Sequence, residues 1–281
     1  MCPKWPNCSR RASPEMSRIA ARFEDLRKRN ETALVAFVTA GDPDMDATEA
    51  MLLGLADAGA DLLEIGVPFS DPIAEGPTIQ RSSERALANG TSLRRILELV
   101  GRIRDRIELP ILLMGYANPI HAMGPVPFAE AAEAVGLDGI IVPDLPMEEG
   151  EPFYKECRSR GIDAVLLAAP TSTPERMEAL VSRTAGFLYY VSLQGVTGFR
   201  DELAQGIAER VELARSFGDI PICVGFGIST PAQAAELRGV ADGVVVGSAF
   251  VRAIEGAGSR EEAVDAITKL ARTLKAALKE S

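Results

Sequence analysis

The chain has 281 residues, of which 47% are hydrophobic, and its 30 basic and 40 acidic side chains give a net charge of -10 at neutral pH. This length and apolar content suffice for one large buried core, and α/β barrels of this size routinely form a single domain. The acidic balance argues against nucleic acid as a ligand, no apolar run approaches the ~20 residues of a membrane span, and the start lacks a signal-type apolar region.

Residues 1–15 are polar, contain proline and lack periodicity, so we expect a disordered extension or a mis-assigned start before a single domain at 16–281. The cysteines show no paired metal spacing, and a chain this large does not need disulfides to fold. They are Cys2, Cys8, Cys157 and Cys223. This usage fits a reducing cytoplasm, and we expect a soluble cytoplasmic protein.

The sequence contains eight short apolar or β-branched runs. The interval between successive runs is long enough for a loop and a helix that lead back to the next strand. The runs cover residues 33–38, 61–66, 110–114, 139–142, 163–168, 187–191, 220–224 and 242–246. Stretches with helical spacing lie between most of them, for example at 47–58, 128–135, 175–181 and 231–237. This alternation predicts parallel strands covered by helices.

A weak repeat of glycine and aspartate stands just before several of these strands. Its copies are Gly59-Ala60-Asp61, Gly136-Leu137-Asp138, Gly161-Ile162-Asp163 and, more loosely, Gly239-Val240-Ala241-Asp242. The glycine can adopt the left-handed backbone conformation that ends an α-helix, and the next strand follows it. Eight such units favour a closed (β/α)8 TIM barrel over an open doubly wound sheet, with extra helices at 18–28 and 261–278.

The second predicted strand ends at Glu64 and passes into a Pro/Gly-rich acidic loop (residues 68–77) that carries Asp71 and Glu75. Glu64 stands between apolar neighbours, so desolvation should raise its pKa towards a value useful in acid/base catalysis. Its alternative role is a structural carboxylate bonded to a neighbouring strand or loop. For Asp71 a turn-capping role is favoured, and Asp144 is ambiguous.

Glycines follow the seventh and eighth predicted strands, in Gly225-Phe226-Gly227 and Gly247-Ser248-Ala249. Barrels often hold a phosphate at this place on backbone N–H groups and a helix N-terminus, without a nearby Lys or Arg. Either glycine pair could merely turn the chain. Both together favour a phosphate site.

Two common routes of carbon–carbon cleavage lack suitable residues. A Schiff base needs a lysine at a strand tip, but every lysine lies in the N-terminal extension or a predicted helix, and the sole histidine, His121, gives no metal cluster. The predicted rim carries a set suited to proton transfer: Glu64, Asp71, Glu75, Tyr116, Asp144, Tyr189 and Thr197. The two tyrosines could equally be core aromatics.

The segment from Leu63 to Pro77, with Ala36 to Pro43 and Gly195 to Gly198, closely resembles the alpha subunit of tryptophan synthase, and the likeness extends from about Met16 to near the C-terminus. The resemblance implies a lyase of L-tryptophan biosynthesis. It splits indole-3-glycerol phosphate into indole and glyceraldehyde 3-phosphate by carboxylate retro-aldol chemistry, without metal or Schiff base. The protonated indole ring then serves as the electron sink.

The resemblance also implies a role for each site residue. Glu64 would shuttle protons at indole C3 and the glycerol hydroxyl, and Glu75 stands where the family has an aspartate facing the indole N–H. Phe37 and Tyr116 match aromatics of the indole pocket, Tyr189 matches the tyrosine of the sixth strand, and Thr197 matches a loop residue that closes the site. The phosphate site matches Gly198, Phe226, Gly227, Gly247 and Ser248.

The family implies a partner, the beta subunit, in a heterotetramer of two alpha and two beta subunits. Pyridoxal phosphate belongs to that partner, and no cofactor is expected in this chain. Glu75 is one methylene longer than the family aspartate. Three interpretations therefore stay open: an active alpha subunit, a stand-alone indole-glycerol phosphate lyase, and a non-catalytic subunit that activates the beta subunit.

Overall fold

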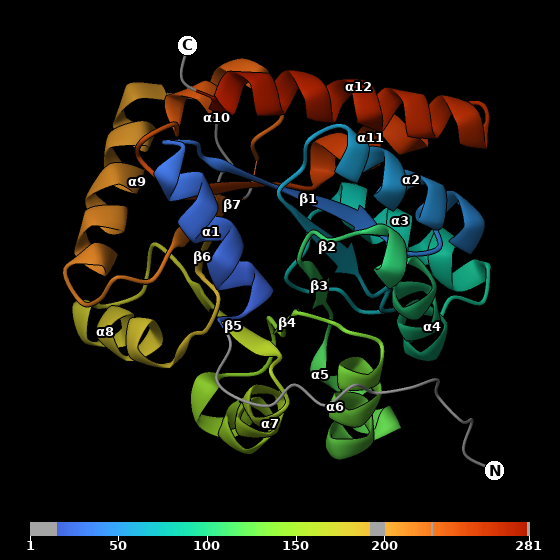
Figure 1. Ribbon diagram of the computed structural model, residues 1–281, viewed down its shortest axis with the longest axis horizontal. Coiled ribbons are helices and arrows are strands. Elements are labelled where there is room, and N and C mark those ends of the chain that lie inside the picture. Colours follow the sequence, from blue (N-terminus) through green and yellow to red (C-terminus); the bar gives the residue numbers. More distant parts are fainter. Residues whose placement is uncertain (1–15, 192–199, 226, 280–281) are drawn as a thin grey trace.

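The computed structural model describes residues 16–191, 200–225 and 227–279. Eight parallel strands form a closed barrel in chain order, β1 to β8, and β8 pairs with β1 (Figure 1). The strands are β1 (Ala33–Thr39), β2 (Leu62–Gly66), β3 (Ile111–Met114), β4 (Gly139–Ile141), β5 (Asp163–Ala168), β6 (Leu188–Val191), β7 (Ile222–Gly225) and β8 (Gly243–Val246).

Helices surround the barrel, and α12 lies along one edge of the molecule (Figure 1). They are α1 (Arg18–Lys28), α2 (Met45–Asp57), α3 (Pro77–Ala88), α4 (Leu93–Ile103), α5 (Ala117–Met123), α6 (Pro125–Ala134), α7 (Met147–Ser159), α8 (Pro174–Arg183), α9 (Arg200–Arg215), α10 (Pro231–Glu236), α11 (Ser248–Glu255) and α12 (Arg260–Leu278), with a short 3₁₀ turn η1 (Arg104–Arg106) after α4.

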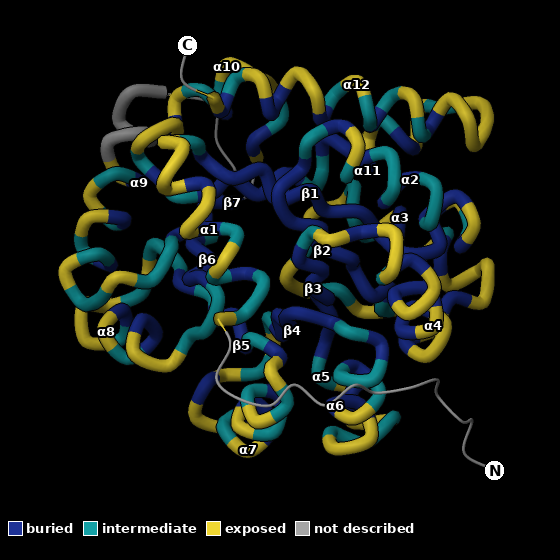
Figure 2. The backbone as a smooth tube through the Cα atoms, in the orientation of Figure 1, coloured by how far each residue is buried: buried dark blue, intermediate teal, exposed yellow. Residues whose placement is uncertain are grey.

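The strands are buried on both faces, as parallel strands under a helical layer must be (Figure 2). One apolar cluster fills the space between strands and helices, and a second fills the barrel interior. Ile19, Phe23 and Leu26 of α1 belong to the interior cluster. The N-terminal helix therefore closes one end of the barrel and leaves the other end for a site.

Three of the four aspartates of the glycine–aspartate repeat bond to the neighbouring strand at the closed end of the barrel, and the fourth, Asp163, accepts a hydrogen bond from Ser17. In each of these three cases the carboxylate accepts a hydrogen bond of 2.8–2.9 Å from the backbone N–H of the first or second residue of that strand. The pairs are Asp61 with Leu34, Asp138 with Ile111, and Asp242 with Ile222. The repeat thus satisfies backbone donors that would otherwise be buried without a partner.

Basic side chains from the flanking helices neutralise two of these aspartates. Arg18 lies 2.7 Å from Asp138, and Arg22 lies 2.9 Å from Asp61. Lys275 of α12 is buried and lies 2.7 Å from Asp61. These ion pairs attach α1 and α12 to the base of the barrel.

The predicted TIM barrel with an extra N-terminal helix is confirmed, and each predicted strand lies within two residues of an observed one. The N-terminal helix has the predicted bounds, and the C-terminal helix begins at Arg260. Residues 1–15 lie outside the described part, so their expected disorder and the domain boundary stay predictions. Among the described residues, no helix combines the length and apolar character needed to cross a membrane.

Candidate active site

The carboxyl ends of the strands open into a cavity of about 270 Å³. TIM-barrel enzymes carry their active sites at this end, and small-molecule pockets start at roughly this size. Five strands contribute lining side chains: Phe37, Glu64, Met114, Tyr189 and Val245. The acidic loop and α3 supply Glu75, Gly76, Pro77, Thr78 and Ile79, and the last two strand ends supply Gly227, Gly247, Ser248 and Arg252.

Glu64 lies in the middle of β2 and not at its end as predicted, because the strand pairing continues to Gly66, and it pairs in register with Phe37 on β1 and Leu112 on β3. Its side chain is buried, and within the described part of the chain neither carboxyl oxygen has a hydrogen-bond partner. Burial, and then the charge of Glu75, raise the pKa of Glu64 to about 8. At neutral pH this carboxyl therefore holds a proton that it can donate.

Glu75 lies in the acidic loop, just before α3. Its backbone N–H donates to the carbonyl of Pro72 at 3.1 Å, and its own carbonyl accepts from the side chain of Gln80 at 2.9 Å. Burial raises the pKa of Glu75 to about 7. The cavity thus holds two carboxyl groups that both titrate near neutral pH, as proton-transfer sites require.

Two aromatic rings lie against strand-end glycines. A Cβ atom on Gly66 would come within 2.5 Å of the Phe37 ring, and one on Gly225 would come within 2.5 Å of the Tyr189 hydroxyl. A side chain at either glycine would force the ring away. The close approach gives the cavity a flat apolar lining suited to an aromatic group.

The glycines after β7 and β8 also line the cavity. Gly227 has a φ of +82°, which favours glycine, and Gly247 directly precedes α11, whose N-terminal N–H groups attract anions. Arg252 lies one turn further along α11 and lines the same cavity. Neutral donors can hold a phosphate without a nearby Lys or Arg, and Arg252 was not among the predicted site residues, although its spacing of four from Ser248 predicts a shared helix face.

Besides Gly76 and Pro77 of the acidic loop, four further lining residues were not predicted: Met114, Val245, Thr78 and Ile79. The first two are strand residues whose sequence context does not differ from that of the core. The other two begin α3, and only the folded position of the acidic loop brings them over the barrel. No sequence signal distinguishes such residues from ordinary packing positions.

Tyr116 is not among the described residues that line the cavity. It is buried beside the acidic loop, where its hydroxyl accepts a hydrogen bond from the backbone of Ala74. Asp71 accepts a hydrogen bond from Ser70 at 2.6 Å, which fits its expected turn-capping role. The predicted site residues Thr197, Gly198 and Phe226 lie outside the described residues.

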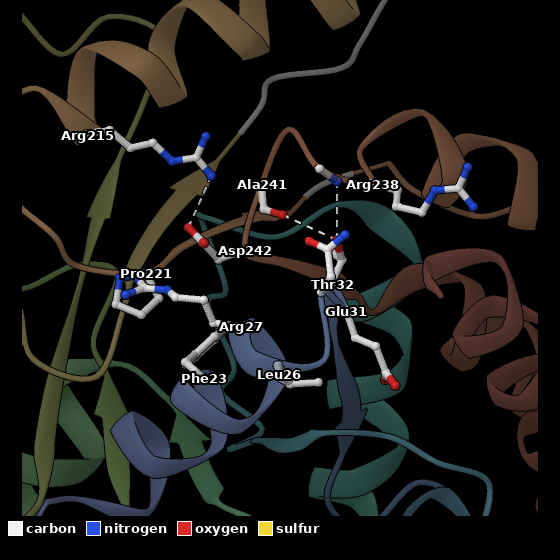
Figure 3. Close-up of a pocket in the computed structure, with 12 residues that line it drawn as sticks. Phe23, Leu26, Arg27, Glu31, Thr32, Arg215, Pro221, Arg238, Ala241 and Asp242 are labelled. Carbon is white, nitrogen blue, oxygen red and sulfur yellow. Dashed lines mark hydrogen bonds and ion pairs between the residues drawn. The ribbon is translucent and has the colours of Figure 1, made fainter. Parts of the chain in front are cut away.

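A second cavity, of about 180 Å³, lies at the closed end of the barrel (Figure 3). Two of its charged side chains pair with each other, because Arg215 points towards Asp242 at 3.5 Å, and a third, Arg27, lies 3.2 Å from Asp219 outside the cavity lining. The Asp242 carboxylate also accepts from the Ile222 backbone. These contacts stabilise the closed end of the barrel, and the candidate active site is the cavity at the open end.

The fold and the cavity together are those of an acid/base enzyme of the TIM-barrel class. The cavity holds two carboxyls with raised pKa values, an aromatic lining and two glycine-containing strand ends.

Residues 23–279 match the family model of the tryptophan synthase alpha chain. The chain belongs to this family, whose members are the lyase subunits that cleave indole-3-glycerol phosphate in tryptophan biosynthesis. The alpha chain of Citrifermentans bemidjiense is 53% identical over 240 residues, which cover 85% of this chain and 90% of that relative. The alpha chain of Geobacter sulfurreducens is 52% identical over 241 residues, covering 85% and 91%.

Solved structures agree with this assignment. The alpha chain of Legionella pneumophila subsp. pneumophila superposes with a TM-score of 0.86 at 37% identity, covering 94% of this chain and 98% of that one. A ligand-free tryptophan synthase structure from M. tuberculosis gives a TM-score of 0.85 at 35% identity, covering 94% and 100%. The resemblance drawn from the sequence motifs is confirmed at the level of the family.

Proposed function

We propose that this chain carries out the lyase reaction of its family with Glu64 as the proton shuttle and Glu75 as the group facing the indole N–H. The observation that carries the proposal is the buried, unpartnered carboxyl of Glu64 inside the strand-end cavity. A structural carboxylate would be hydrogen-bonded at this depth, because an unpaired buried polar group costs free energy. The lack of a partner in the described part supports a functional role.

The proposed reaction needs only proton transfers. Protonated Glu64 donates to indole C3, and the positive charge that forms on the ring nitrogen is stabilised by the carboxylate of Glu75. Ionised Glu64 then takes the proton of the adjacent glycerol hydroxyl, the O–H electrons form the aldehyde carbonyl, and the electrons of the broken carbon–carbon bond return to the ring. Indole and glyceraldehyde 3-phosphate leave, and Glu64 is protonated again.

Substrate contacts follow from the lining of the cavity. Phe37 and Tyr189 would enclose the indole ring, and the backbone N–H groups at Gly227, Gly247 and Ser248 would bind the phosphate. Contacts from Thr197, Gly198 and Phe226, and contact of the indole with Tyr116, stay predictions.

The proposed partner is a pyridoxal-phosphate-dependent beta subunit in a cytoplasmic heterotetramer, and this chain would need no cofactor of its own. The acidic loop would form part of the contact. It carries Ile73, whose side chain is 84% exposed and is therefore accessible to a partner. Indole release would then be coupled to the partner through closure of nearby loops.

Indole release from indole-3-glycerol phosphate, measured with and without a beta subunit, tests the proposal. Glu64→Gln should lower the rate by ~10² to 10⁴-fold, because the amide keeps the shape and removes the proton. Glu98→Gln on α4, at an exposed position, is the matched control. Normal turnover of Glu64→Gln would make Glu64 structural. Full activity without partner would identify a stand-alone lyase, and stimulation of the beta subunit without cleavage would identify a non-catalytic activator.

A further inference from the structure

Tyr116 occupies the position between β3 and α5, and its side chain is only 1% exposed. The next residue, Ala117, donates its backbone N–H to the carboxylate of Asp144 at 2.9 Å. The backbone next to Tyr116 is therefore held in place by a hydrogen bond at the barrel rim. The buried side chain of Tyr116 can act as a fixed support for the residues that contact it.

Two contacts join Tyr116 to the acidic loop. The backbone N–H of Ala74 donates to the Tyr116 hydroxyl at 3.0 Å. The ring of Phe69 stacks on the Tyr116 ring, with centroids 5.0 Å apart and an interplanar angle of 27°. One side chain of the barrel thus holds the loop near its start and again next to Glu75.

The stretch between these contacts extends towards solvent. Ile73 is 84% exposed, and Ser70 and Asp71 are also exposed. The loop has local bonds of its own, including the one from Ile73 N–H to Asp71 at 2.9 Å. Such bonds shape the loop, but they do not tie it to the barrel.

Glu75 follows Ala74 directly, and consecutive Cα atoms are held about 3.8 Å apart by a planar peptide. A shift of the Ala74 peptide must therefore move the start of the Glu75 side chain. Burial, and then the charge of Glu75, raise the pKa of Tyr116, so its hydroxyl is neutral at physiological pH and can accept the Ala74 hydrogen bond.

We propose that Tyr116 is a positioning residue that sets the place of Glu75 in the cavity by anchoring the acidic loop through Ala74 and Phe69. The inference rests on the proposed role of Glu75. It adds the structural device that allows a side chain on an exposed loop to reach a defined point above the substrate.

Tyr116→Phe tests the anchor, because phenylalanine keeps the ring on Phe69 and removes only the hydroxyl. Tyr154→Phe is the matched control. Tyr154 is also 1% exposed, and its hydroxyl donates to the carbonyl of Leu145 at 2.8 Å, so the control loses one buried hydrogen bond away from the acidic loop. Hydrogen exchange of peptides covering residues 69–76 should become about tenfold faster in Tyr116→Phe and stay unchanged in the control.

Kinetics of indole release then test the consequence. In Tyr116→Phe we expect kcat to fall about tenfold with little change in KM, because a misplaced reacting group loses rate more than binding. In a Glu75→Gln background the added Tyr116→Phe change should have no further effect, since its target is gone. A rise in KM that persists in that background would show direct contact with the indole and overturn the inference.

Two other outcomes separate this inference from the proposed function. If Glu75→Gln keeps only a small residual rate while Tyr116→Phe keeps the parent kcat and the parent exchange rates, the anchor is wrong and the role of Glu75 stands. If Glu75→Gln turns over as fast as the parent, the proposed role of Glu75 is wrong, and the positioning role of Tyr116 falls with it.

Discussion

Replacing Glu64 with glutamine should make the protein more resistant to rising pH. An ordinary glutamate has a pKa of 4.5, and that of Glu64 in the folded chain is about 8. Between these values the folded state keeps a proton that the unfolded state has released. The free energy of unfolding must therefore fall as pH rises from 4.5 to 8, and this destabilisation reaches its full size only above pH 8.

The size of the effect follows from the two pKa values. Each pKa unit corresponds to about 1.36 kcal/mol, so Glu64 destabilises the folded state by about 1 kcal/mol at pH 5 and about 3 kcal/mol at pH 7. Glutamine does not titrate, and its own burial cost is the same at every pH. The free energy of unfolding of Glu64→Gln, relative to the parent, should rise by about 2 kcal/mol between pH 5 and pH 7.

Urea unfolding of the two proteins at several pH values between 5 and 8 measures this difference. Glu75 titrates in both proteins, so its contribution largely cancels. The exposed Glu98→Gln variant serves as control for any general effect of removing a carboxylate. Parallel pH dependences for Glu64→Gln and the parent would refute the reasoning, because they would mean that Glu64 is ionised or partnered in the folded chain.

Further outcomes concern the loop, the phosphate and the partner. Glu75→Asp should raise kcat by up to ~10²-fold, since a group misplaced by about 1 Å costs that much, whereas Glu75→Ala should nearly abolish cleavage; an alanine variant as active as the parent would remove Glu75 from the mechanism. Gly247→Ala places a Cβ 3.2 Å from the Phe37 ring and beside the proposed phosphate site, so KM should rise about tenfold, and inorganic phosphate should compete in the parent. An unchanged KM would place the anion site elsewhere. Purified beta subunit should co-migrate with this chain and each should stimulate the other; neither effect on mixing would favour a stand-alone lyase.

The barrel could be predicted from the sequence because its signals are local and repeated. Each strand is a short apolar run, and glycine with aspartate marks several strand starts. Glu64 was also predictable as a site residue, since a carboxylate in an apolar strand is unusual enough to need an explanation. Its raised pKa follows from the same context.

Residues that act through tertiary contacts could not be placed in this way. The spacing of four residues places Arg252 on the same helix face as Ser248, but only the position of α11 after β8 directs that face to the cavity. Tyr116 was interpreted as a pocket aromatic, but its hydroxyl bonds to Ala74, which is 42 residues away in the chain. Neither composition nor periodicity encodes such a pairing.

The aspartates at the closed end have a consequence for how the chain folds. Parallel strands with two apolar faces carry no alternating pattern, so hydrophobicity alone cannot distinguish the correct alignment of neighbours from one shifted by a residue. Asp61, Asp138 and Asp242 each bond one particular N–H of an adjacent strand. A shifted barrel would leave that donor unpaired, at about 1–3 kcal/mol for each joint. These three side chains therefore favour the native alignment of the strands over a shifted one, at the end of the barrel opposite the candidate active site.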